Sequence, residues 1–129
     1  MSGGIFMPKI YIDQGHNPSG ANTGAEGNGL REQDLVYTIG QELAARLRAD
    51  PDFEVRLSRP TRDTLLGTTN ATSLAARVNA ANQWGADYFI SIHKSNNRKR
   101  NCLIIGNNFY PAVSCRPVNL AIQHNQFAV

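Results

Sequence analysis

The sequence contains few cysteines, no long apolar run and, after Asp87, no acidic residue at all. Its two cysteines, Cys102 and Cys115, are too few for a disulfide framework and lack the paired spacing of a thiolate zinc site. No apolar run approaches the roughly 20 residues that a transmembrane helix needs, so we expect no membrane partner. The first 13 residues also lack a basic start followed by an apolar segment, which predicts a protein made in the cytoplasm without a signal peptide.

Charge is divided unevenly along the chain. Residues 1–93 carry eight basic and ten acidic side chains, whereas residues 94–129 carry five basic ones and none that is acidic. The run Arg98-Lys99-Arg100 would be the natural contact for a nucleic acid, but no aromatic side chains that could stack on bases are interleaved with it. We therefore expect no nucleic-acid partner. The composition, 41% hydrophobic and 18% charged, is that of one ordinary globular domain spanning residues 1–129.

Three segments have the alternating, β-branched and aromatic residues that are typical of strands: residues 8–13, 53–57 and 87–93. Residues 102–105 could form a further strand. Between the first strand and the next periodic segment, residues 14–29 include five glycines, which predicts a loop without helix or strand.

The first of two predicted helices runs from Leu30 to about Ala49 and ends at Asp50-Pro51. Its apolar residues recur every four positions and form one stripe, which Leu30 widens. The members of the stripe are Leu35, Ile39, Leu43 and Leu47.

A second helix is expected to end at Trp84, with Thr72 or Ser73 as its N-cap and Gly85 as its stop signal. Helices therefore alternate with strands along the chain. This order predicts an α/β fold, a three-layer domain with a mostly parallel central sheet flanked by helices.

Three residues that bind metals lie at the ends of these predicted elements. His16 follows the first strand, Glu32 lies in the first turn of the first helix, and His93 closes the third strand. Ligands of such sheets gather at the carboxyl ends of the strands. Two imidazoles and a carboxylate, with a fourth position left to water, are the ligand set of a hydrolytic zinc site. Taken singly, a strand-end histidine is more often a hydrogen-bonded structural residue, and Glu32 would suit the positive end of the helix dipole.

Three separated motifs strengthen this interpretation. They read IDQGHNPSGANTGAEGNGLREQD, RLSRPTRD and LAARVNAANQWGADYFISIH. In order and spacing they are similar to the zinc-dependent amidase-3 family, the N-acetylmuramoyl-L-alanine amidases, over about residues 8–93. The resemblance implies a peptidoglycan hydrolase that cleaves the amide between N-acetylmuramic acid and L-alanine with zinc-activated water.

By this resemblance His16, Glu32 and His93 match the zinc ligands, and Asp13 would orient a ligand. The family body also contains two arginines, at the positions of Arg59 and Arg77 in this sequence. We expect structural pairing or packing for both.

The implied partner is peptidoglycan, and the glycine-rich loop of residues 15–29 would form one wall of a shallow groove for it. Asn17 and Asn28, which lie on this loop, are the candidate substrate-binding residues.

The resemblance stops at the tail, residues 94–129. The family needs a glutamate near the end of the domain as general base, and no Asp or Glu follows Asp87 here, so Glu26 on the loop is the remaining candidate. The domain is therefore expected to be shortened or altered at its C-terminus, through a shifted reading frame or through true divergence. A shortened sheet exposes an edge strand, which would favour self-association.

Two functional interpretations remain open. The first is an amidase that acts on the bacterial cell wall after release, in the manner of a phage endolysin or a mother-cell lytic protein. The second is a non-catalytic relative that binds zinc or muropeptides, or an inactive product, because the carboxylate is missing.

Overall fold

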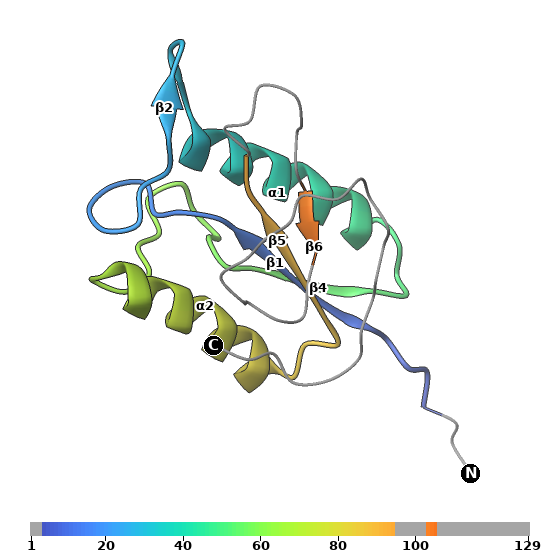
Figure 1. Ribbon diagram of the computed structural model, residues 1–129. Helices are drawn as coiled ribbons and strands as arrows, with labels where there is room; N and C mark the ends of the chain where they lie inside the picture. The colour runs from blue at the N-terminus through green and yellow to red at the C-terminus, as the bar shows by residue number, and fades with distance from the viewer. Residues whose placement is uncertain (1–3, 95–102, 106–129) are drawn as a thin grey trace.

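In the computed structural model of the chain, which describes residues 4–94 and 103–105, a four-stranded sheet lies between two helices (Figure 1). Strand β1 (Lys9–Gln14) pairs in parallel with β4 (Glu54–Leu57) on one side and with β5 (Tyr88–Ile92) on the other. Strand β6 (Leu103–Ile105) pairs antiparallel with β5 and gives the order β4-β1-β5-β6. The predicted α/β fold with a mostly parallel sheet is confirmed.

Burial on both faces of β1 explains why its sequence is almost continuously apolar. Ile10 and Ile12 point to one face, where they pack with Val36 of helix α1 (Glu32–Arg48). Tyr11 points to the other face, where it packs with Val78 of helix α2 (Asn70–Trp84). The helices therefore cover opposite faces of the sheet, and the predicted three layers are present (Figure 1).

The segment predicted to be an unstructured loop contains a small hairpin. Strands β2 (Glu26–Gly27) and β3 (Leu30–Arg31) pair antiparallel and project beyond the start of α1 (Figure 1). Asn28 and Gly29, with φ of 52° and 74°, make the turn, and Asn-Gly is the favoured pair where both central residues need a positive φ. The helix consequently begins at Glu32 and not at Leu30.

The apolar stripe predicted for the first helix is only partly correct. Leu43, Leu47 and the fully buried Ala44 contribute to the core beside β1. Leu30 belongs to the hairpin and is exposed, and Ile39 is exposed on the helix itself. An exact four-residue repeat drifts around a helix of 3.6 residues per turn, so its members do not all face the sheet.

Helix α2 begins three or four residues earlier than predicted. Its N-cap is Thr69, whose hydroxyl accepts a hydrogen bond from the amide of Thr72 while the Thr72 hydroxyl accepts one from the Thr69 amide. Thr72, one of the two predicted caps, is therefore the partner in a capping box, and Ser73 lies inside the helix. The predicted stop at Gly85 is confirmed by its left-handed conformation, with φ of 76°.

Within the described residues, neither helix is both long and apolar enough to cross a membrane. The two cysteines and the basic run at residues 98–100 lie outside the described residues. The assignment of residues 1–129 to one domain stays a prediction.

Replacing Thr69 with alanine should lower the free energy of unfolding by about 1 kcal/mol, because the amide of Thr72 loses its acceptor at the start of α2. Urea unfolding measures the change. Thr68→Ala, at the exposed neighbouring position, is the control and should have a smaller effect. Equal losses in the two variants would contradict the assignment of Thr69 as the cap.

Candidate metal centre

The topology of the sheet places the candidate site at the carboxyl ends of β1 and β5. The chain leaves β1 through α1 toward β4, then returns through α2 to β5 on the other side of β1. The two connections lie on opposite faces, so the strand order reverses between β1 and β5, which is where ligands of such sheets gather. His16 lies two residues beyond β1, and His93 directly follows β5.

The structure brings the three predicted metal-binding residues together. His16 Nε2 lies 3.1 Å from Glu32 Oε1 and 3.2 Å from His93 Nδ1, and His93 Nδ1 lies 3.5 Å from Glu32 Oε1. Tetrahedral zinc with bonds of about 2.0–2.1 Å separates its ligand atoms by about 3.3 Å. The spacing of the three atoms therefore fits one ion of this size. Among the described residues, the histidine, cysteine and acidic side chains form one group close enough to hold a metal ion, and its members are His16, Glu32 and His93.

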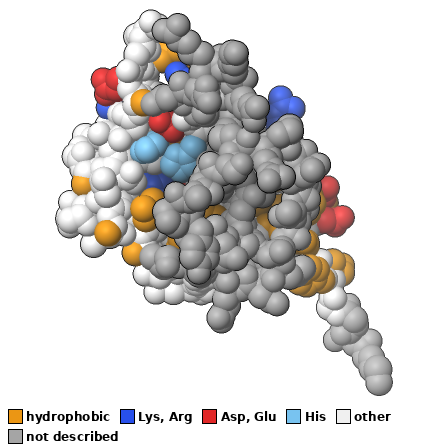
Figure 2. All heavy atoms as spheres, viewed as in Figure 1, with side chains coloured by type: hydrophobic (Ala, Val, Ile, Leu, Met, Phe, Trp, Pro, Cys, Tyr) orange, Lys and Arg blue, Asp and Glu red, His pale blue; other side chains and the backbone are white. Residues whose placement is uncertain are grey.

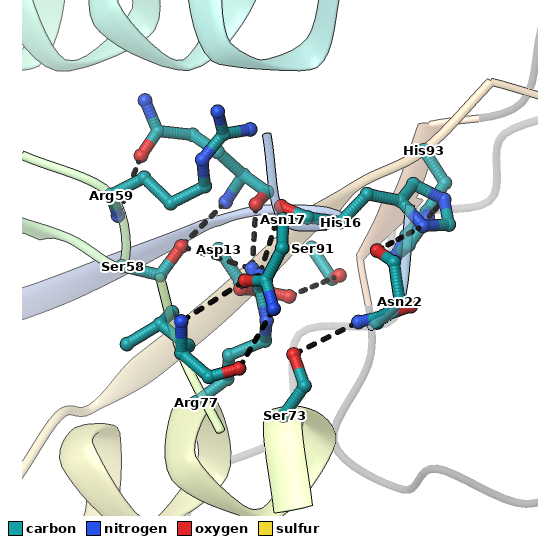
Figure 3. A network of polar contacts seen from close by, with 12 residues as sticks. Asp13, His16, Asn17, Asn22, Ser58, Arg59, Ser73, Arg77, Ser91 and His93 are labelled. Carbon is teal, nitrogen blue, oxygen red and sulfur yellow. Dashed lines mark hydrogen bonds and ion pairs between the residues drawn. The ribbon is translucent and has the colours of Figure 1, made fainter. Parts of the chain in front are cut away.

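His16 is held by the loop that follows it. Its Nδ1 donates a hydrogen bond to the carbonyl oxygen of Asn22 (3.3 Å), because a carbonyl can only accept, so Nε2 is the ring nitrogen that faces Glu32 and His93. The side-chain amide of Asn22 in turn donates to Ser73 Oγ of α2 (3.0 Å) (Figure 3). Neither contact was predicted, because a backbone carbonyl leaves no signal in a sequence and because Asn22 and Ser73 lie 51 residues apart.

Glu32 is buried at the start of α1 and accepts hydrogen bonds from two backbone amides. The amide of Lys94 donates to Oε1 (2.8 Å) and that of Ala25 to Oε2 (3.3 Å). Burial alone raises the pKa of Glu32. The opposing effects outweigh it and lower the pKa below its ordinary value of 4.5; in order of size they come from the Lys94 amide, the charge of His16, the Ala25 amide and the charge of His93. Glu32 is therefore an ionised carboxylate at neutral pH.

The imidazole of His93 is mostly buried, and its surroundings favour the uncharged form. Burial, followed by repulsion from His16, lowers the pKa of His93 below its ordinary value of 6.5, against the opposing influence of Asp13 and Glu32. Both imidazoles nevertheless reach the surface, with about a fifth of each side chain exposed. Figure 2 shows them side by side, next to acidic atoms, where a ligand from solvent can approach.

Two glycines allow this close approach. A side chain at Gly15 would overlap the imidazole ring of His93, and one at Gly24 would meet Glu32 Cβ at 2.7 Å and His16 Cδ2 at 3.0 Å. Neither glycine has a positive φ, so the requirement at both positions is for space.

Asp13 was predicted to orient one of the metal-binding side chains, but it does not contact an imidazole directly. Among the described residues, its carboxylate accepts hydrogen bonds from Arg77 Nη1 (2.8 Å) and Ser91 Oγ (2.8 Å), not from an imidazole. Arg77 and Arg59 are both buried in hydrogen bonds, as predicted, and Arg59 donates to the carbonyls of Gln33 and Arg62.

The three remaining candidates lie in different surroundings. The side chain of Asn17 is buried and hydrogen-bonded to Ala21 and Leu66, so it stabilises the loop, and its contact with substrate stays a prediction. Asn28 is exposed at the tip of the β2–β3 hairpin, and its contact with substrate stays a prediction. Glu26 is exposed and forms an ion pair with Arg31 at 3.1 Å, outside the metal-binding group.

Comparison with known proteins identifies the family of the chain. Residues 10–113 match the Amidase_3 family, described as N-acetylmuramoyl-L-alanine amidase, so the match extends 20 residues beyond the predicted boundary at residue 93. The chain belongs to this family.

The chain is similar to several amidases over about two thirds of its length. N-acetylmuramoyl-L-alanine amidase CwlM of Bacillus licheniformis is 47% identical over 90 residues, 67% of this chain and 31% of that protein. A sporulation-specific N-acetylmuramoyl-L-alanine amidase of Bacillus subtilis is 42% identical over 87 residues, 67% of this chain and 31% of that protein. The chain thus spans about a third of the length of these curated relatives.

The fold is also similar to a solved structure, the catalytic domain of the amidase CwlV of Bacillus (Paenibacillus) polymyxa var. colistinus. The TM-score is 0.58 with 32% sequence identity, and the match covers 69% of this chain and 46% of that one.

Replacing Gly15 with alanine should destabilise the metal-free protein by about 1–3 kcal/mol, because the added methyl group overlaps the ring of His93. Gly27→Ala is the matched control, since a side chain there meets nothing, and should change the free energy of unfolding by less than about 0.5 kcal/mol. Urea unfolding compares the two. Similar values would show that the His93 ring does not pack against Gly15.

The lowered pKa values predict that the metal-free protein loses stability as the pH falls. Between the ordinary pKa of 6.5 and the lower pKa of folded His93, the unfolded state binds more protons, so acidification favours unfolding. Glu32 adds a second loss below its ordinary pKa of 4.5. Urea unfolding at about pH 7.5 and about pH 5.5 should show a smaller loss for His93→Gln than for the unaltered protein. An equal loss would contradict the assignment to His93.

Proposed function

We propose that His16, Glu32 and His93 bind a zinc ion, and that the domain they belong to cleaves the amide between N-acetylmuramic acid and L-alanine in peptidoglycan. The observation that carries the zinc site is the convergence of two imidazole nitrogens and one carboxylate oxygen at 3.1–3.5 Å. The family description and the names of the relatives supply the substrate.

The protonation states of the three side chains suit a cation. The Asn22 carbonyl holds the proton of His16 on Nδ1, and the lowered pKa values keep His93 neutral and Glu32 ionised. Metal ligands must have this state, because each bond to the ion needs a free lone pair. When bound here, zinc would polarise the scissile carbonyl and lower the pKa of water toward neutrality.

A second candidate function follows from the missing general base. No acidic residue follows Asp87 in these 129 residues, and Glu26 is paired with Arg31 on the hairpin. General acid–base catalysis contributes about 10²- to 10⁴-fold to a rate. Without such a base, the 129 residues would form a non-catalytic relative that binds zinc or muropeptides, or an inactive product, and would show little or no hydrolysis.

Zinc content and stem-peptide release from purified peptidoglycan test these proposals together. The unaltered protein should bind one zinc per chain, and His93→Ala should lose it, because the ion keeps only two protein ligands. Glu26→Gln is the matched control and should retain the metal.

Release that depends on His93 would establish the amidase, and a loss of release in Glu26→Gln would identify that residue as its base. Zinc without release would establish the non-catalytic relative. A chain without zinc would refute the metal site.

A further inference from the structure

A single side chain from α2 binds the whole turn that leads from β1 to His16. Arg77 Nη1 donates to Asp13 Oδ1 (2.8 Å) and to the carbonyl of Gln14 (2.6 Å). Arg77 Nη2 donates to the carbonyl of His16 (2.9 Å) and to Asn17 Oδ1 (3.2 Å). Figure 3 shows the guanidinium beneath this turn, with the two imidazoles beyond it.

The backbone of His16 needs such support. Its φ is 66°, in the left-handed region that residues with a side chain uncommonly adopt, although histidine, like asparagine and aspartate, adopts it more often than most. Such a conformation persists only where surrounding contacts hold it. The hydrogen bond from Arg77 to the His16 carbonyl acts directly on this peptide unit.

The surroundings of Arg77 indicate a role in geometry more than in stability. Arg77 and Asp13 are 1% and 3% exposed, and removing two charges from water offsets most of the gain from pairing them. Ser91 Oγ donates to the second oxygen of Asp13 (2.8 Å), and Ser91 lies on β5 two residues before His93. The ion pair therefore connects both strands that carry an imidazole.

We propose that Arg77 is a positioning residue that holds the His16 turn in its metal-binding conformation, with Asp13 and Ser91 fixing the guanidinium. The proposal rests on the metal site proposed above. The proposal accounts for the buried charge of Arg77. In the described hydrogen bonds this guanidinium contacts neither imidazole ring and not the carboxylate of Glu32.

Arg77→Lys tests the proposal in the full chain. Lysine keeps the charge beside Asp13, but one ammonium group cannot span Asp13 and the carbonyl of His16 as a planar fork does. Zinc affinity, measured by competition with a chromogenic chelator, should fall by about 10- to 100-fold. The visible absorption bands of cobalt bound in place of zinc should also change, because they report the geometry of the ligands.

Val78→Ala is the matched control. Val78 follows Arg77 on α2 and is buried with Tyr11 and Phe89, away from the His16 turn. This variant should lower the melting temperature while leaving the zinc affinity and the cobalt spectrum nearly unchanged.

The outcomes separate the two proposals. If folded Arg77→Lys binds zinc as the unaltered protein does, or if Val78→Ala loses as much affinity, the positioning role is refuted and the zinc site stands. If Arg77→Lys does not fold, Ser91→Ala decides, and it should weaken zinc binding in the same direction by a smaller factor. Unaltered affinity in Ser91→Ala would then refute the role. If the unaltered protein binds no zinc, both proposals fail.

Discussion

The parallel pairing of β1 with β5 is the constraint on which the rest of the site depends. The ladder runs to Gln14 opposite Ile92, and the amide of Gly15 extends it by donating to the Ile92 carbonyl at 3.1 Å. The chain segments that carry the two imidazoles therefore leave the sheet side by side. A shift of one residue would move Ile12 to the polar face and Asp13 to the apolar one, so burial on both faces specifies this register.

The two faces of the sheet differ near the site, and the difference has a physical reason. Toward α1, Ile12 and Ile92 remain in an apolar core, whose burial stabilises the domain. Toward α2, Asp13 and Ser91 form a buried polar layer around Arg77. Apolar side chains there could fill the space, but they could not bind the carbonyls of the His16 turn. The polar layer therefore fixes the conformation of the His16 turn, whereas the apolar layer stabilises the domain.

Sequence patterns succeeded where an element buries a face and missed features held by local hydrogen bonds. The helices follow from a period near 3.6, and the strands follow from short apolar, β-branched runs between turn signals, because burial on one face or on both selects such residues. The β2–β3 hairpin has two residues in each strand, too few to show a period, although Asn28-Gly29 carried its turn signal. The cap of α2 was misplaced because Thr69, Thr72 and Ser73 have equivalent hydroxyl groups, and only their geometry distinguishes them.

By itself, the sequence determined the fold class, and its resemblance to a family pointed to the three side chains that the structure places close enough to hold one metal ion. Only the tertiary structure decided what positions them. Arg77 donates to the backbone carbonyl of His16, and Asn22 accepts from the His16 ring through its own backbone carbonyl. Every residue possesses such a carbonyl, so no residue type identifies these contacts. Arg77 also lies 61 residues from His16, and chain folding alone brings the two together. Folding likewise brings the side chain of Asn17 into hydrogen bonds with Ala21, Leu66 and Arg77, which the sequence pattern did not indicate.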